Sequence, residues 1–478
     1  MNNRNKKIIK YIKENEYNNF HFRTHNRNKF DILENFGFFS ISLNIIIRIR
    51  NKKLNKVKLL SSSSEFINNY QVEYIELYGL SLLLLMKYLF EGFRFNSFLL
   101  IITYFSVFYE KVFKFNSYLS YISVIVTFLY LWSQFNQKHF SLPKPTGQFR
   151  TCYKQIQIKD KYSTSVSVYY PCLNQNQNDI DYKWLPDVKY SKQIYERMQL
   201  QFKWVPYQLI FDFGLSFLNY ITFKASIEQP IMNKNLDVVI VSHGFTQHRN
   251  AYTFLCQELA SEGYVVFSLQ HTEMVYPWDL KQTKILNSGN KPEVMEKYQN
   301  LRATHLNWRC EQVMNLIQQI KFGQINDIFD NFNPLSINLI GHSFGGATVL
   351  KVAQNIQIDS VISFDPWLFP FNKDDFLKQV KGRTLILSKD INRKFQQVFE
   401  PKLLMDFLKN NNVDHYRIKG LDHAYPNDLT FLFPIEMAVF GELRTTTKVY
   451  QINKILISIT KKYIKSQSFN NEEINQFC

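Results

Sequence analysis

The sequence predicts an α/β fold with a mainly parallel sheet covered by helices on both faces. From residue 142 onward, short runs rich in β-branched residues alternate with longer stretches of helical character, a pattern typical of this architecture. Five of these runs are continuously apolar and end in polar residues, as expected of buried parallel strands. They occupy residues 236–245, 263–271, 336–343, 359–367 and 383–390. Residues 155–171 predict an antiparallel hairpin that enters the same sheet.

The chain is expected to have four parts. Residues 1–70 form a basic, largely disordered arm: the first 60 residues hold 14 Lys and Arg against 4 Asp and Glu, which is +10 of the total charge of +17. Residues 71–135 form a hydrophobic segment, residues 141–465 a catalytic domain, and residues 466–478 a polar tail. A basic arm can bind nucleic acid or an anionic membrane. The apolar segment that follows favours the membrane, and no nucleic-acid partner is expected.

Three apolar stretches, at residues 74–90, 97–109 and 117–132, make residues 71–135 a candidate for two or three membrane-spanning helices. The alternative is a soluble helical hairpin packed on the enzyme. Basic residues just before the first stretch, such as Arg48 and Arg50, predict a cytosolic N-terminus. Three spans would export the catalytic domain, whereas the absence of any Asn-x-Ser/Thr acceptor favours two spans and a cytosolic domain. The side of the membrane and the oligomeric state therefore stay open.

The five cysteines are odd in number and show no CxxC spacing, so they indicate neither a disulfide framework nor a metal cluster. Whether Cys152 and Cys172 pair is left open by the sequence. The fold is expected to depend on its apolar core.

A Gly-x-Ser-x-Gly motif, residues 341–345, lies between an apolar strand and a run compatible with a helix. This context is that of the nucleophile elbow of the α/β-hydrolase fold, in which small residues allow a sharp turn that exposes the serine hydroxyl. The motif predicts that Ser343 is the catalytic nucleophile. Such a serine needs a histidine to take its proton and a carboxylate to orient that histidine.

The partners of Ser343 are expected downstream, in the order acid and then histidine. Only His415 and His423 follow the serine. His423 lies in a loop after a short strand, where the catalytic histidine belongs, whereas His415 begins that strand. Asp365 and Asp390 each end a predicted strand, and the residues alone do not separate them. Asp422 is adjacent to the histidine and is interpreted as a turn residue.

The oxyanion hole should consist of two main-chain amides that face the developing charge. Phe344, the residue after the nucleophile, supplies one amide. Phe245 supplies the other, because Gly244 ends an earlier strand and allows the chain to turn the next amide inward.

The sequence resembles the plasma-type (type II) platelet-activating factor acetylhydrolases, also known as calcium-independent group VII phospholipases A2. The resemblance extends from residue 142 to about residue 433. It is carried by LPKPTGQFR (142–150), VYYP before a Trp-Leu-Pro, SHGF (242–245), GHSFGGATV (341–349) and FDPWLFP (364–370). GHSFGG alone occurs in many hydrolases, but the following D-x-W-x-F-P is specific to this family.

The resemblance implies the assignment of Asp365 as the acid, of His423 as the histidine, and of Phe245 and Phe344 as the oxyanion amides. It further implies hydrolysis of an acetyl, short or oxidised acyl chain at the sn-2 position of a phospholipid. The reaction would proceed through an acyl-enzyme and without a cofactor, on a protein with an N-terminal membrane anchor.

Residues 198–223 are apolar enough to touch lipid or to form a lid helix. The alternatives are an esterase for a small ester, lactone or polyester, and an inactive hydrolase fold.

Overall fold

The computed structural model describes residues 142–173, 179–186, 218, 221–271, 292–325, 329, 332–389, 401–418, 421–432 and 449–467. The chain divides into two compact units, residues 1–140 with 206–220 and residues 141–205 with 221–478. The second unit is described below. The predicted arm and apolar segment, nearly all of the polar tail and most of the segment 198–223 lie outside the described residues. Among the described helices, none has both the length and the apolar character needed to cross a bilayer.

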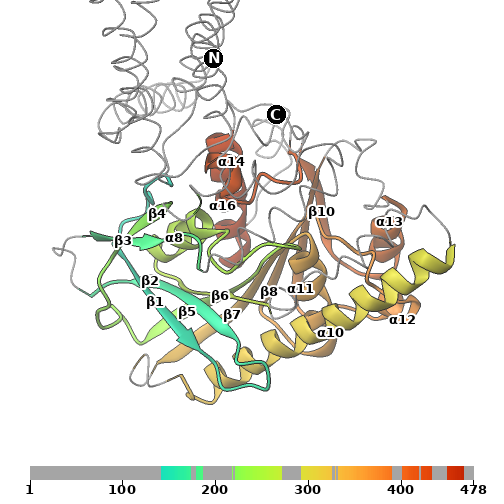
Figure 1. Ribbon diagram of the computed structural model, residues 1–478, viewed down its shortest axis with the longest axis horizontal. Coiled ribbons are helices and arrows are strands. Elements are labelled where there is room, and N and C mark those ends of the chain that lie inside the picture. The colour runs from blue at the N-terminus through green and yellow to red at the C-terminus, as the bar shows by residue number, and fades with distance from the viewer. Residues whose placement is uncertain are drawn as a thin grey trace, which may run out of the picture. The chain divides into compact units, whose positions relative to one another are not determined.

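A ten-stranded mixed sheet forms the centre of this unit, with the order β10-β9-β8-β7-β5-β6-β2-β1-β4-β3 (Figure 1). The strands are β1 (Thr151–Gln157), β2 (Ser165–Pro171), β3 (Asp179–Lys183), β4 (Thr222–Ser226), β5 (Asn235–Ser242), β6 (Val265–Leu269), β7 (Asn333–His342), β8 (Ser360–Phe364), β9 (Arg383–Lys389) and β10 (Asp414–Ile418). Six consecutive strands, from β10 to β6, run parallel to one another. The predicted α/β-hydrolase fold is confirmed in this mainly parallel sheet.

All five apolar runs predicted as strands are strands, β5 to β9. The predicted hairpin is β1 with β2, and β2 joins the sheet antiparallel to β6. The edge strand β3 (DIDYK) and its partner β4 were not predicted, because β3 is largely exposed and its alternation of polar and apolar residues extends over only five positions.

Cys152 and Cys172 form a disulfide, with their Cα atoms 5.4 Å apart. The register of the hairpin explains the pairing, since Cys152 lies opposite Tyr170 and Cys172 follows β2 directly. The sequence had indicated no disulfide framework. The pairing depends on strand register, which cysteine spacing alone does not reveal.

Helices cover both faces of the sheet (Figure 1). They are α8 (Thr253–Ser261), α10 (Pro292–Lys321), α11 (Phe344–Asn355), α12 (Lys373–Leu377), α13 (Pro401–Asn410), α14 (Leu429–Leu432) and α16 (Val449–Ile464). Alternate residues of β5 are buried on opposite faces of the sheet. Val238 and Ile240 belong to one core cluster with residues of α10 and α11. Val239 and Val241 are also buried but lie outside that cluster. Burial on both faces explains why these strands are apolar without alternation.

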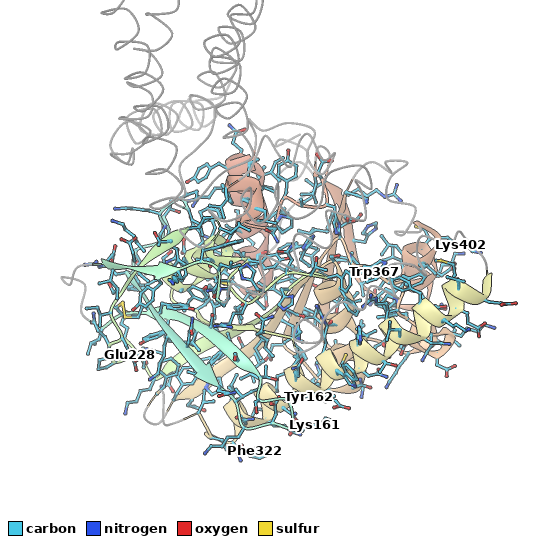
Figure 2. All side chains as sticks on the ribbon, viewed as in Figure 1. Lys161, Tyr162, Glu228, Phe322, Trp367 and Lys402 are labelled. Atoms are coloured by element: carbon cyan, nitrogen blue, oxygen red, sulfur yellow. A yellow bond between two sulfur atoms is a disulfide. The ribbon has the colours of Figure 1, made fainter. Side chains whose placement is uncertain are left out.

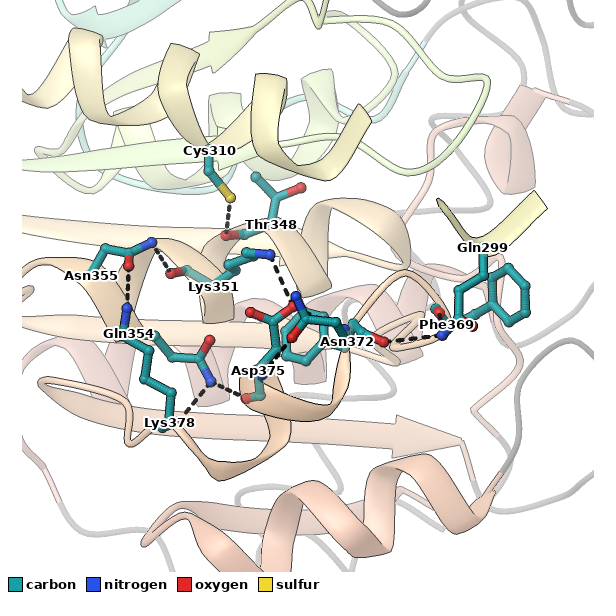
Figure 3. A network of polar contacts seen from close by, with 11 residues as sticks. Gln299, Cys310, Thr348, Lys351, Gln354, Asn355, Phe369, Asn372, Asp375 and Lys378 are labelled. Atoms are coloured by element: carbon teal, nitrogen blue, oxygen red, sulfur yellow. Dashed lines mark hydrogen bonds and ion pairs between the residues drawn. The ribbon is translucent and has the colours of Figure 1, made fainter. Parts of the chain in front are cut away.

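Polar contacts attach the helices to the rest of the unit. Tyr162 and Lys161, in the β1–β2 turn, both contact Glu311 of α10 (Figure 2). Lys351 of α11 forms an ion pair with Asp375 of α12 at 2.9 Å. Figure 3 shows this contact within the surrounding polar network. Because α11 begins at the residue after Ser343, the ion pair of Lys351 helps to hold the helix that follows the predicted nucleophile.

Candidate active site

Ser343 occupies the sharp turn between β7 and α11. Its backbone has φ +57° and ψ −116°, a strained conformation that persists only where the surroundings impose it. Glycines make the turn possible. A Cβ on Gly341 would collide with the carbonyl of Gly345, and a Cβ on Gly345 would collide with the carbonyl of Ser242. The predicted elbow geometry is therefore present, and close backbone packing accounts for both glycines of the motif.

Asp365 follows the neighbouring strand β8, with φ +41°. Its amide donates to the carbonyl of Leu387 at 2.7 Å, and its Oδ2 lies 2.6 Å from Nδ1 of His423. Burial alone would raise the pKa of this carboxyl. The hydrogen bond to His423 and the charge of Lys389, 3.7 Å away, outweigh burial, so the pKa of Asp365 lies below its ordinary value. The side chain is thus held as a carboxylate at neutral pH.

His423 lies in the loop between β10 and α14 and is buried. Because Asp365 is a carboxylate, Nδ1 of His423 carries the proton of their hydrogen bond, which leaves Nε2 as the basic nitrogen. The main-chain carbonyl of His423 accepts a hydrogen bond from Nε2 of His342 at 2.7 Å. Since His342 directly precedes Ser343, this bond attaches the histidine loop to the elbow.

The loop after β5 lies against the nucleophile. A Cβ on Gly244 would be 3.5 Å from Cβ of Ser343. The ring centroids of Phe245 and Phe344 are 6.0 Å apart, and both rings contact Trp367. The two predicted oxyanion residues therefore lie close together, Phe245 in the loop after β5 and Phe344 in the turn after β7, at the carboxyl ends of two neighbouring parallel strands.

Of the other candidates, the structure describes His415 and Asp422. Nε2 of His415 lies 2.8 Å from Oγ of Ser388, and His415 is part of β10, as predicted. Asp390 lies outside the described residues. Asp422 is buried, and its main-chain carbonyl accepts from the amide of Tyr425, as expected of a turn residue.

Two residues near the site were not assigned any role from the sequence. The hydroxyl of Tyr252 lies 2.5 Å from Nδ1 of His342 and accepts from the amide of Gly244 at 3.1 Å. Nζ of Lys389 lies near the carboxylate of Asp365. Tyr252 belongs to no recognisable motif, so the sequence offered no signal for its contacts with Gly244 and His342. Lys389 is the last residue of β9 and lies next to Asp390, the residue that ends the predicted strand, so its position near the site could have been suspected.

Residues 134–477 match the family described as "Platelet-activating factor acetylhydrolase, isoform II". The chain belongs to this family. The membership confirms the resemblance inferred from the sequence motifs, and the matched region includes every residue of the site described above.

Mammalian platelet-activating factor acetylhydrolases are similar to this member of the family over most of their length. The protein of Cavia porcellus is 24% identical over 356 residues, which are 68% of this chain and 78% of that protein. The protein of Bos taurus is 22% identical over 355 residues, with the same two coverages. A solved ferulic acid esterase from Streptomyces cinnamoneus has a TM-score of 0.43 and 14% identity, covering 68% of this chain and 90% of its own; this likeness is too distant to inform the site.

Proposed function

We propose that this platelet-activating factor acetylhydrolase family member is a carboxylic ester hydrolase that removes an acetyl, short or oxidised acyl chain from the sn-2 position of a phospholipid. One observation carries the proposal: the carboxylate of Asp365 lies 2.6 Å from Nδ1 of His423, whose loop is bonded to the residue before Ser343. This arrangement is that of a nucleophile, a base and an orienting acid. Phospholipid is the proposed substrate because the relatives are named for it.

In the proposed reaction, Nε2 of His423 takes the proton of the Ser343 hydroxyl while Oγ attacks the sn-2 carbonyl carbon. The amides of Phe245 and Phe344 stabilise the resulting oxyanion. The intermediate collapses by breaking the bond to the glycerol oxygen, which receives the proton from His423 and leaves as a lysophospholipid. Water, deprotonated by His423, then attacks the carbonyl carbon of the acyl-enzyme; the bond to Oγ breaks, His423 returns the proton to Oγ of Ser343, and the acyl group leaves as a carboxylic acid. Asp365 stays ionised throughout and holds the imidazole in the required tautomer.

The test is covalent labelling by a fluorophosphonate probe together with hydrolysis of short-chain phosphatidylcholine. Ser343→Ala is expected to abolish both, and calcium chelation is expected to change neither. Ser363→Ala is the matched control, because Ser363 is a buried serine of the adjacent strand β8 whose hydroxyl has no hydrogen-bond partner among the described residues. Labelling that persists in Ser343→Ala would remove this serine from the mechanism.

A substrate panel separates the proposal from its alternative, an esterase for small non-phospholipid esters, lactones or polyesters. Both share the same catalytic groups, so only the rates on different esters distinguish them. Vesicles of phosphatidylcholines that differ only in the sn-2 chain should be hydrolysed fastest when that chain is short. Faster hydrolysis of water-soluble esters, with no activity on any phospholipid, would favour the alternative.

We also propose that residues 71–135 anchor the protein in a membrane. Three apolar stretches within this segment support the proposal, as does the basic arm before it. The full chain should remain with membranes after alkaline carbonate extraction, whereas a chain that begins at residue 136 should be released. Release of the full chain by carbonate would contradict insertion.

A further inference from the structure

Arg309 of α10 is fully buried, which is rare for arginine because a guanidinium stays charged and loses its hydration on burial. Its Nη1 donates to the carbonyl of His243 at 2.6 Å, and its Nη2 lies 3.4 Å from the carbonyl of Gly244. The guanidinium carbon lies 4.3 Å from the centre of the Phe344 ring, within cation–π range. A single buried cation therefore contacts both chain segments from which the proposed oxyanion amides come.

The side chain of His243 is a second donor to the carbonyl of Gly244. Its Nδ1 lies 2.8 Å from the carbonyl oxygen of Gly244, and because a carbonyl only accepts, Nδ1 carries the proton. Its Nε2 accepts from the amide of His271 at 3.2 Å. Burial, reinforced by the charge of Arg309, keeps the pKa of His243 well below its ordinary value. The imidazole is thus a neutral donor with one fixed tautomer.

The orientation of the next amide follows from peptide geometry. The described residues contain no cis peptide bond, and in a trans peptide the C=O and the N–H point in opposite directions. The donors on the carbonyl of Gly244 thus direct the N–H of Phe245 away from Arg309. The cation also lies at the negative end of this peptide dipole, so its charge adds to the stabilisation of an anion at the N–H end.

We propose that Arg309 is a positioning residue for the oxyanion hole: together with His243, it fixes the peptide between Gly244 and Phe245 so that the Phe245 amide faces the ester oxygen held at Ser343. The proposal rests on the proposed function and adds to it a residue that does not touch the substrate. Proximity of this peptide to the nucleophile supports it, since a Cβ on Gly244 would approach Cβ of Ser343 to 3.5 Å.

The test compares Arg309→Met and Arg309→Lys in the full chain. Loss of one oxyanion donor lowers kcat by about 100-fold to 1,000-fold in other hydrolases, so we expect about a 100-fold fall in kcat for Arg309→Met. Arg309→Lys keeps the charge and one donor, and we expect a fall of about 10-fold. KM for short-chain phosphatidylcholine should stay within about twofold in both, because the oxyanion exists only in the transition state.

Gln319→Met is the matched control. Gln319 is a buried polar residue of the same helix that also donates to a main-chain carbonyl, that of Lys159 at 3.2 Å, but in the β1–β2 turn. We expect its kcat to stay within twofold of wild type, although its thermal midpoint falls. A purely structural role for Arg309 would give the same result at both positions.

The outcomes separate the two proposals. Wild-type protein that neither hydrolyses esters nor reacts with a fluorophosphonate would contradict the proposed function itself. Active wild type with unchanged kcat in the Arg309 variants would overturn only the positioning role. If Arg309→Met does not fold, Arg309→Lys decides: a fall in kcat of about fivefold or more at constant KM supports the proposal, and an unchanged kcat overturns it.

Discussion

The imidazole of His342 donates from Nε2 to the main-chain carbonyl of His423 across 2.7 Å. Its Nδ1 therefore acts as the acceptor for the hydroxyl of Tyr252, 2.5 Å away, and that hydroxyl in turn accepts from the amide of Gly244 at 3.1 Å. One chain of hydrogen bonds thus joins the glycine loop, the elbow and the histidine loop. Each of these three segments carries a group that the proposed reaction needs.

Tyr252→Phe should lower both kcat and the stability of the fold. Removal of the hydroxyl leaves the amide of Gly244 and Nδ1 of His342 without this partner in a buried place, at a cost of about 1–3 kcal/mol. The loops it joins then lose their common alignment, and misplacement of about 1 Å costs roughly 100-fold in rate. We expect kcat for short-chain phosphatidylcholine to fall by about 10-fold or more, with little change in KM.

Tyr264→Phe is the control for that experiment. Tyr264 is also buried, and its hydroxyl has no hydrogen-bond partner within the part of the chain that the structure describes. Its removal should leave kcat unchanged. Equal effects of the two substitutions would show that loss of a buried hydroxyl, and not the connection through His342, is responsible.

Asp365→Asn is expected to reduce kcat by about 10,000-fold, because an amide no longer selects the tautomer of His423 that can accept the serine proton. The fold should persist, since the side chains are nearly the same size. Asp390→Asn tests the carboxylate that the sequence could not exclude, and it should retain nearly full activity. A large loss in Asp390→Asn with a small loss in Asp365→Asn would reverse the assignment. Steady-state kinetics on one short-chain ester are sufficient.

The pair of Asp365 and His423 should make the stability of the fold depend on pH in the acid range. The pKa of Asp365 is lowered in the folded protein, so its contribution to stability is present above the unfolded pKa of about 3.9 and is lost as pH falls through the folded pKa. Wild type should therefore lose unfolding free energy relative to Asp365→Asn as pH is lowered below about 4. Urea unfolding of both proteins at several pH values measures the difference. A constant difference across that range would contradict the lowered pKa.

Gly345→Ala should prevent the elbow from forming. An added Cβ would collide with the carbonyls of Ser242 and His243, which are main-chain atoms that cannot move without displacing β5. We expect either no soluble folded protein or folded protein without fluorophosphonate labelling. Gly244→Ala is the milder comparison, because its Cβ would come no closer than 3.2 Å to any atom, the nearest being the hydroxyl of Tyr252; it should fold but react slowly.

Asp428→Ala should destabilise the fold through a helix cap that is distant in sequence. The carboxylate accepts from the amides of Thr253 and Phe254, at 2.7 and 3.1 Å, and from the indole of Trp184 at 2.9 Å. Removal leaves the amide of Phe254 and the indole N–H of Trp184 without this acceptor, and the amide of Thr253 keeps only its bond to the carbonyl of Asn250 at 3.3 Å. We expect a cost of about 3 kcal/mol. Asp406→Ala, at an exposed ion pair with Lys409, should change the unfolding free energy by less than about 0.5 kcal/mol.

Much of this architecture was predictable because its signals are local. Strands β5 to β9 are short apolar runs with polar ends. The elbow at Ser343 is predicted by five consecutive residues, because its two glycines lie so close to neighbouring main-chain atoms that no Cβ would fit. The edge strand β3 and its neighbour β4 were missed, because each has only five residues and β3 is largely exposed, so neither carries a long apolar pattern.

The sequence by itself determined the five apolar strands β5 to β9, the turn that carries Ser343 and the short list of its partners, because periodicity and glycine requirements act over a few neighbouring residues. Only the tertiary structure decided that Asp365 meets His423, that Tyr252 and Arg309 hold the surrounding loops, and that Asp428 caps a helix 175 residues before it in the chain. Hydrogen bonds require their atoms to lie within a few tenths of an ångström of ideal positions. For groups on separate strands and helices, such positions follow from sheet register and helix packing, which no local pattern encodes.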